Sequence, residues 1–362
     1  MSAKDIKNLP ASVLARLLTL AEKTGDNYQV LLAQFASERF LYRLGSSALR
    51  DRFVLKGAML LRVWSANPYR ATRDLDLLRR GEGGAEAIRG DIEAICATKV
   101  DADGIEFDGK SIRLETIRPE DEYAGTRVTL LARCGSARIP LQVDIGVADA
   151  LWPPAQSLRY PNLLGFPPPE VLTYAPESVI AEKLEAIVAL GDRNSRIKDY
   201  FDLRYLANRF EFEGAILAES IRRTFQRRRT VIPKEDPFGL TAEYWDNPAR
   251  IPQIRAFIRR ANLEVGPDAG KEILGILAPS SCRSWKTSER ASKQPGLGRR
   301  GGRGGECASG RFRKTSAFQT LSGPQGLRGR VAGPAFRARP KYMLDMGDPA
   351  PARRRQNLFS ES

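Results

Sequence analysis

Hydrophobic residues recur at helical spacing through the first part of the chain. Residues 10–24 and 28–43 each carry an apolar stripe, and a Gly-Asp-Asn break at 25–27 separates them. In the second segment the stripe is formed by Leu31, Leu32, Phe35 and Ala36. The pattern predicts two amphipathic helices, which we expect to pack over the strand that follows.

Apolar runs and alternating patterns typical of strands follow. Phe53–Leu55 predicts a short buried strand, Lys56–Ala58 a tight glycine turn, and residues 59–64 a short helix. Further strands are expected over 74–78, 105–108, 111–118, 123–134 and 137–147, with a helix over 85–97. The Gly135-Ser136 link predicts that the last two of these strands form a hairpin.

The second half of the chain changes character twice. Residues 151–176 contain seven prolines and no period, so we interpret them as a surface connector between two lobes. Helices are predicted over 177–190, 196–206, 213–229 and 248–262. From residue 279 onward Arg, Gly, Ser and Pro dominate, and such a segment cannot bury enough apolar surface to order itself. The predicted division is a mixed domain at 1–150, the connector, a helical lobe at 177–278 and a disordered basic tail at 279–362.

Two carboxylates in the strand over 74–78 are the first candidate chemistry. Asp74 and Asp76 share one face, and Leu75 and Leu77 share the other. The acids would lie about 6–7 Å apart, where they raise each other's pKa and favour a cation between them. Mg²⁺ suits this geometry, because it takes one or two carboxylates plus phosphate oxygens. The alternative is a solvated strand face.

The neighbouring glycine turn favours the metal interpretation. Backbone N–H groups at Lys56-Gly57-Ala58 can cradle a phosphate. Asp144, on the polar face of the strand over 137–147, is either a third carboxylate beside Asp74 and Asp76 or a solvated residue.

The helical lobe adds further charged candidates. Lys183 falls inside the apolar stripe of its helix, so it either snorkels along its stem or meets an anion such as a phosphate. Lys198, Asp199 and Asp202 occupy one arc of a largely buried helix, as an internal ion-pair network or as an active-site wall. The arginines at 227–229 are either a nucleic-acid contact or a solvated helix end.

Composition narrows the chemistry. The 362 residues include no histidine, which excludes a His general base, a Ser-His-Asp triad and a His-ligated zinc. Four cysteines without metal-ligand spacing fit a reduced, cytoplasmic compartment. The chain has no apolar run long enough for a membrane span, and no apolar signal region opens it.

The net charge of +15 belongs to the tail. Residues 280–362 hold 18 Lys and Arg against 5 acidic residues, whereas the first 279 residues hold 40 against 38. The tail is either an RNA-binding segment or a non-native reading-frame extension. Its lack of regular aromatic–arginine spacing favours the latter.

The ordered set of motifs resembles the AbiEii/AbiGii toxin family over roughly residues 10–265. These are nucleotidyltransferase-like proteins of toxin–antitoxin and phage-defence systems, which include the mycobacterial MenT toxins. The matching motifs are Lys56-Gly57-Ala58, Arg73-Asp74-Leu75-Asp76-Leu77, Val143-Asp144-Ile145, Glu182-Lys183-Leu184 and Arg196-x-Lys198-Asp199-Tyr200-x-Asp202-Leu203.

The resemblance implies an α+β protein with the DNA polymerase beta-like nucleotidyltransferase fold, a small mixed sheet with helices, plus a helical C-terminal lobe. It implies magnesium-dependent transfer of a nucleotide from an NTP to an RNA end, which in MenT-type members is the tRNA acceptor stem. A cognate antitoxin encoded nearby is the expected protein partner. The alternatives are phosphoryl transfer on the same fold and a non-catalytic RNA-binding module.

Roles for individual residues follow from the resemblance by motif. Asp74 and Asp76 would hold the metals, with Asp144 matching the general fold's third acid. Lys183 would contact the triphosphate, and Asp199 would be an essential acid in the cleft. The nucleotide-binding set would be Lys56, Gly57, Ala58, Arg73, Arg196 and Lys198. Ala58 departs from the Gly or Ser that is usual in the wider fold, which removes a hydroxyl contact and keeps the backbone N–H.

Overall fold

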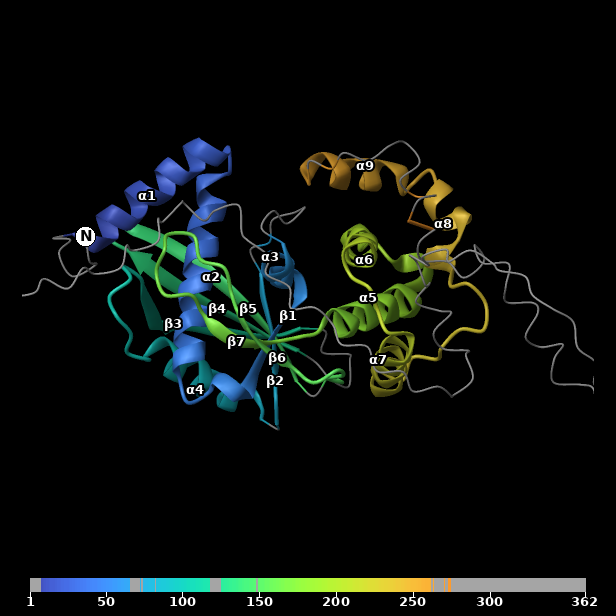
Figure 1. Ribbon diagram of the computed structural model, residues 1–362, viewed down its shortest axis with the longest axis horizontal. Helices are drawn as coiled ribbons and strands as arrows, with labels where there is room; N and C mark the ends of the chain where they lie inside the picture. Colours follow the sequence, from blue (N-terminus) through green and yellow to red (C-terminus); the bar gives the residue numbers. More distant parts are fainter. Residues whose placement is uncertain are drawn as a thin grey trace, which may run out of the picture.

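The elements of the chain form two groups, a sheet with its covering helices and a bundle of shorter helices (Figure 1). A computed structural model describes residues 8–65, 72, 74–81, 83–117, 125–147, 149–261, 263, 270 and 273–274. The predicted basic tail at 279–362 lies outside the described residues. Within the described part, no helix is both long and apolar enough to cross a membrane.

Within the described residues, seven strands form one mixed sheet in the order β3-β4-β5-β2-β1-β7-β6. β1 pairs antiparallel with β2 and parallel with β7, and β2 pairs parallel with β5. The remaining neighbours are antiparallel, and Cys134 pairs with Ala137 across the predicted hairpin turn, which is confirmed. The strands are β1 (Phe53–Lys56), β2 (Leu75–Arg79), β3 (Glu106–Ile117), β4 (Gly125–Cys134), β5 (Ala137–Val147), β6 (Gln156–Arg159) and β7 (Glu170–Thr173).

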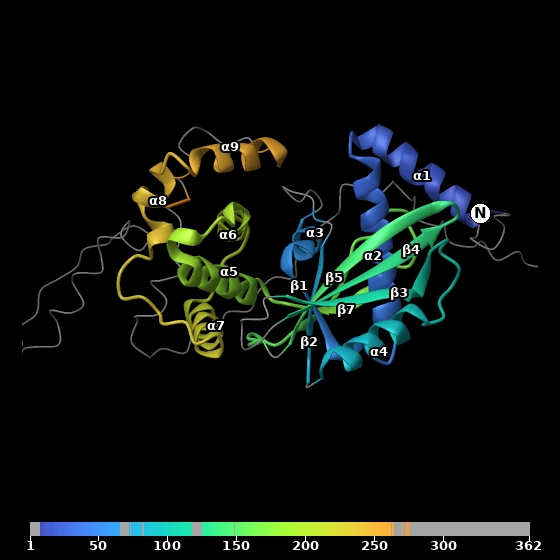
Figure 2. The ribbon, with the colours of Figure 1, turned by 180° about the vertical axis from the view of Figure 1, so that it is seen from behind.

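Helices α1 (Leu9–Thr24) and α2 (Tyr28–Ser46) form where the apolar stripes predict them. Asn8 caps the first, and the Oδ1 atom of Asn27 accepts from two backbone N–H groups at the start of the second. The expectation that both pack over β1 is wrong for α1, which packs on the end of the β4–β5 hairpin (Figure 2). Only the second half of α2 joins the core that contains β1.

The sheet has one apolar face and one polar face near its centre. Leu75 and Leu77 of β2 share a buried cluster with residues of α2 and of α4 (Ala85–Cys96). The opposite face carries acidic side chains and meets the helical bundle at a cavity. β3 is a single strand with a register shift after Asp108, where the sequence predicted two strands.

The proline-rich segment over 151–176 contains two strands that the sequence reading missed. β7 lies beside β1 within the sheet, and β6 forms its edge. The chain between them is anchored on α2, because Glu38 accepts a hydrogen bond from the Leu163 N–H and Arg39 donates one to the Pro167 carbonyl. The sequence pattern does not predict these short strands, because the surrounding prolines interrupt the alternation of apolar and polar residues. The predicted domain boundaries stay a prediction.

The second group of elements is helical, as expected. The same hydrophobic cluster that contains β1 and β2 continues into it, so the two groups share a core. A short helix at 242–246, which was not predicted, precedes the last one. The helices are α3 (Leu60–Trp64), next to β1, then α5 (Pro176–Leu190), α6 (Ile197–Arg209), α7 (Gly214–Arg227), α8 (Ala242–Asp246) and α9 (Ile251–Arg260).

The buried Glu38 makes stability depend on pH. Burial raises its pKa to about 7, although Arg39, the Leu163 N–H and Arg62 favour the charged form. The folded protein therefore binds this proton more tightly than the unfolded chain, whose pKa is near the ordinary 4.5. Its contribution to stability is full below about pH 4.5 and falls as the pH rises through about 7.

We expect Glu38→Gln to flatten this dependence. The unfolding free energy of the variant minus that of the wild type should increase from pH 5 to pH 8, by at most about 3 kcal/mol, because only the wild type loses stability as Glu38 ionises. Urea unfolding at both pH values measures it. Glu22→Gln, at an exposed position of α1, is the control and should leave the wild-type profile unchanged. Parallel profiles for wild type and Glu38→Gln would contradict the assignment.

Candidate active site

Three carboxylates meet where β2 and β5 run side by side. Leu75 and Leu77 are fully buried, whereas Asp76 is partly exposed and Asp74 is exposed. The alternation predicted for this strand is therefore confirmed. Asp76 pairs with Asp144 in the parallel register, so the three acids project from one face of the sheet.

The turn after β1 fixes the position of Asp76. Lys56 and Asp76 are register partners, and Gly57 follows with a φ of 71°. A Cβ on Gly57 would lie 2.0 Å from Oδ2 of Asp76. Position 57 requires glycine for two reasons. Its backbone is left-handed, and the Asp76 carboxylate occupies the space that a side chain would fill.

Gly57→Ala should therefore destabilise the protein more than the backbone alone explains. Gly25→Ala is a matched control, because Gly25 has a φ of 74° and nothing within 4 Å of its would-be Cβ. Both variants bear the left-handed penalty of about 1–2 kcal/mol. Only Gly57→Ala should lose a further 1–3 kcal/mol or so from overpacking. Equal losses in urea unfolding would contradict the close approach of Asp76.

The surroundings of Asp76 suit a cation. Burial raises its pKa to about 6. Lys56 and Lys198 oppose this rise, whereas Asp144 and Asp74 add to it. A divalent ion between Asp74 and Asp76 would reverse the rise, because it supplies the largest local charge. Two carboxylates at an open cavity fit Mg²⁺, which completes its shell with water and phosphate oxygens.

Asp144 is held by an arginine rather than left open. Its two oxygens accept from Nε and Nη2 of Arg127 at 2.9 and 2.8 Å. The Gln142 amide bridges it to Asp74, at 3.2 and 3.5 Å. Within the part of the chain that the structure describes, no three acidic, cysteine or histidine side chains form a ready-made metal site. The role of Asp144 as a third ligand stays a prediction.

Lys183 links the two helices α5 and α6. Its ammonium lies 2.7 Å from Oδ1 of Asp199 and 2.6 Å from Oδ2 of Asp202. Arg196 meets the other oxygen of Asp199 at 2.6 Å, and both aspartates are buried. Burial lowers the pKa of Lys183, but the two carboxylates outweigh it and raise the pKa above its ordinary value. For Lys198, Asp199 and Asp202, the sequence left two interpretations, an internal ion-pair network or an active-site wall. The ion-pair network is present at Asp199 and Asp202, and Asp199 also lines the cavity.

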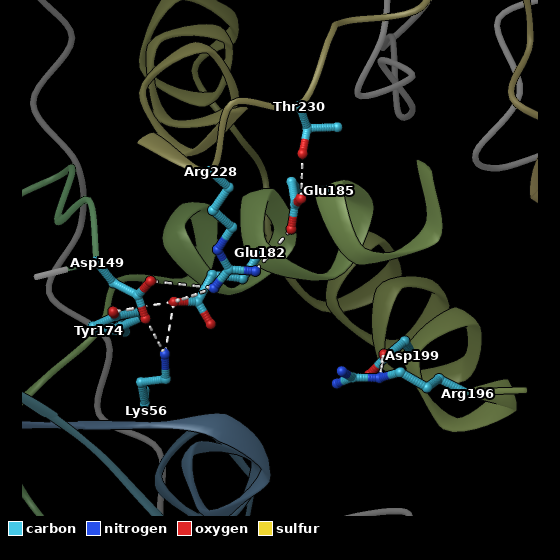
Figure 3. A network of polar contacts seen from close by, with 9 residues as sticks. All are labelled: Lys56, Asp149, Tyr174, Glu182, Glu185, Arg196, Asp199, Arg228 and Thr230. Carbon is cyan, nitrogen blue, oxygen red and sulfur yellow. Dashed lines mark hydrogen bonds and ion pairs between the residues drawn. The ribbon is translucent and has the colours of Figure 1, made fainter. Parts of the chain in front are cut away.

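Lys56 belongs to a second network, which joins the sheet to α5 and α7 (Figure 3). Its ammonium lies 2.6 Å from Asp149 and 2.9 Å from Glu182. Arg228 contacts the same two acids at 3.4 Å and reaches Glu185 at 2.8 Å. Burial lowers the pKa of Lys56, but Glu182 and its neighbours raise it well above the ordinary value. The lysine is thus charged and already neutralised by protein carboxylates.

One cavity of about 770 Å³ collects these groups. Arg73 lies outside the described residues. The other predicted site residues line the cavity together, but this does not test what each of them does, so their roles stay predictions. The cavity is lined by the ten remaining residues predicted from the motifs: Lys56, Gly57, Ala58, Asp74, Asp76, Asp144, Lys183, Arg196, Lys198 and Asp199.

Several charged residues of the cavity were missed from the sequence. Arg127 pairs directly with Asp144 in the β4–β5 register, so the predicted hairpin could have pointed to it. Glu182 adjoins Lys183 in its motif. Arg228 was expected at a solvated end or on nucleic acid, but it is mostly buried among carboxylates. Asp149, which pairs with Lys56 but does not itself line the cavity, carries no signal in the sequence.

A family model described as Nucleotidyl transferase AbiEii toxin, Type IV TA system, matches residues 39–273. No curated protein matches. Among solved structures, JHP933 from Helicobacter pylori is 15% identical, with a TM-score of 0.37, over 65% of this chain and 96% of that one. An antigenic nucleotidyltransferase-like protein from Paracoccidioides brasiliensis is 13% identical, with a TM-score of 0.30, over 54% and 90%.

Proposed function

Because the chain belongs to the AbiEii nucleotidyltransferase toxin family of type IV toxin–antitoxin systems, we propose that it transfers a nucleoside monophosphate from an NTP to an RNA. The acceptor we favour is the 3′ end of a tRNA, in a cytoplasmic toxin–antitoxin or phage-defence system. The family implies a nucleotide substrate and an antitoxin partner. What supports the chemistry is one observation: two adjacent carboxylates and several cations line a single cavity.

The carboxylates of Asp74 and Asp76 would hold Mg²⁺, which when bound activates a hydroxyl and neutralises a pyrophosphate leaving group. Gly57 keeps the space that Asp76 needs. The exposed Lys198 and the outer part of Arg196 supply positive charge for the phosphates. Lys183 pairs with Asp199 and Asp202 in the wall, so its third N–H is the one that would remain for a phosphate.

The reaction that follows is an in-line displacement at the α-phosphorus. The RNA hydroxyl oxygen forms the new bond, the bond to the bridging oxygen of the β-phosphate breaks, and pyrophosphate leaves. The hydroxyl proton passes to water or to a carboxylate of the cavity. No histidine is required, which agrees with the sequence.

The decisive experiment is incubation of the full chain with Mg²⁺, total tRNA and each of the four NTPs, labelled at either the α- or the γ-phosphate. We expect label in RNA from at least one α-labelled NTP and from no γ-labelled one. Label from the γ-phosphate alone would replace the proposal by phosphoryl transfer. RNA binding without any label transfer, while another family member works alongside, would replace it by a non-catalytic RNA-binding role.

A further inference from the structure

A second cavity adjoins the first on the far side of the α6 N-terminus. It also measures about 770 Å³ and lies between the start of α6 and the helix α9. Arg196 and Lys198 line both cavities, so the two share a wall. We call the second cavity the α6–α9 groove.

Among the described residues, the charges that line the α6–α9 groove are all positive. They belong to Arg196, Lys198 and Arg260. Lys198 and Arg260 are exposed, and among the described residues Lys198 has no ion pair. Arg196 gives one nitrogen to Asp199, and its guanidinium head points away from α6 (Figure 3). Three cations, of which only Arg196 pairs with a carboxylate among the described residues, make a surface that suits phosphate groups.

The rest of the groove is apolar. Pro252, Ala256 and Phe257 of the α9 side face Ile197. Phe257 is only partly buried and packs on the buried Phe201, with ring centroids 5.1 Å apart. A partly exposed aromatic ring beside cations is the usual surface for the unstacked bases of a single strand.

The two walls are fixed to each other. Arg250, just before α9, donates to the backbone carbonyls of Asn194 and Asp192, in the loop before α6. Its guanidinium also lies 4.1 Å from the centroid of the Tyr244 ring. Together with the Phe201–Phe257 contact, this anchor makes the groove a built feature rather than a gap between loose helices.

We propose that the α6–α9 groove binds the single-stranded 3′ end of the acceptor RNA and leads it into the cavity that holds Asp74 and Asp76. The phosphates lie along Lys198 and Arg260, and a base or ribose lies on Phe257. This inference rests on the proposed function, because it assigns the path of the acceptor in that reaction. The proposal also agrees with the pattern of ion pairs. Lys198 lines the groove and has no ion pair among the described residues, whereas Lys56 and Lys183 are paired with carboxylates.

Two neighbouring arginines of α9 provide a matched test. Arg260 lines the groove, whereas Arg259, equally exposed, does not. With the full chain, we expect Arg260→Glu to raise the KM for tRNA about tenfold and to leave the KM for NTP unchanged. Arg259→Glu, which makes the same change of charge, should leave both within about twofold of wild type. Thermal unfolding of both variants should match wild type, since neither arginine is buried.

A binding measurement separates this inference from the proposed function. A 12-nucleotide RNA that carries 4-thiouridine near its 3′ end is cross-linked by ultraviolet light to the full chain, and the cross-linked peptides are identified by mass spectrometry. We expect cross-links in 252–261, lost in Arg260→Glu and kept in Arg259→Glu. If these cross-links form but no NTP label is transferred, the groove inference stands and the proposed function fails.

The opposite pattern overturns the inference. Label transfer with cross-links only elsewhere, such as in the basic tail, would leave the proposed function standing and remove the groove from it. Equal tRNA KM values for the two variants would do the same. Protection of 252–261 by the purified antitoxin, without any RNA cross-link there, would assign the groove to a protein partner instead.

Discussion

Asp76→Asn is expected to lower nucleotide transfer by about 10²–10³-fold, the range for loss of one charged contact that stabilises the transition state. The amide keeps the shape of the side chain and removes the negative charge that a metal needs. The fold should survive, because Asp76 makes no ion pair shorter than 4 Å within the described residues, and because burial already disfavours its charged form. Transfer of the α-phosphate label to tRNA measures the activity, and urea unfolding measures the fold.

Asp108→Asn is the matched control for this change. Asp108 is also a strand aspartate, but it pairs with Arg133 on the surface, outside the cavity. We expect wild-type transfer from that variant. Retention of full activity by Asp76→Asn would remove Asp76 from the chemistry, and with it the metal assignment.

Local patterns were enough to predict much of the site. Alternation in β2 places Asp74 and Asp76 on one face, because the period of a strand depends only on its own backbone. The glycine at position 57 predicts a tight turn for the same local reason, and the structure adds that its backbone is left-handed. The short Gly135-Ser136 link likewise predicts a hairpin from its own residues. Each of these features depends on a few neighbouring residues and on no tertiary contact.

The choice of partners for the charged residues could not be read in the same way. Lys56 is predicted to bind nucleotide, yet its ammonium meets Asp149 and Glu182. These acids lie 93 and 126 residues further along the chain. Asp149 comes just after β5 and Glu182 belongs to α5, so the pairing of the strands and the packing of α5 bring them near. An ion pair depends on which groups tertiary structure places within a few ångströms, and no period in the sequence encodes that.

The strands β6 and β7 were missed for a related reason. Each has only four residues, and prolines interrupt the sequence around them. β7 is a strand because β1 offers a free edge and the Tyr174 N–H donates to the Leu55 carbonyl just beyond it. Pairing with a distant strand, rather than local propensity, decides its conformation.

Lys183→Met is expected to be the most destabilising single change in the site. The side chain is 12% exposed and sits between Asp199 and Asp202, which are 0% and 1% exposed. Methionine keeps the length of the stem but leaves two carboxylates buried side by side, a loss typically of about 3–5 kcal/mol. Burial raises the pKa of Asp199, and Lys183 and Arg196 outweigh it, so the folded pKa lies below the ordinary value. That stabilisation is present at neutral pH and is lost as the pH falls through the acidic range. The deficit of the variant should therefore be largest near pH 7 and smaller near pH 4.

Lys198→Met is the informative comparison, because Lys198 lies one helix turn from Asp202 on the same helix but is exposed. We expect it to reduce transfer with unchanged stability, whereas Lys183→Met should reduce both. Adding Asp202→Asn, in Lys183→Met/Asp202→Asn, should recover part of the lost stability, since it removes the repulsion between two buried carboxylates that have lost the cation they share. Urea unfolding of the three variants, read beside their transfer rates, separates a structural role from a role in binding. If Lys183→Met instead unfolds at the same urea concentration as the wild-type protein but loses nucleotide transfer, the ion pairs contribute little to folding. Lys183 would then act mainly on the triphosphate, as its motif predicts.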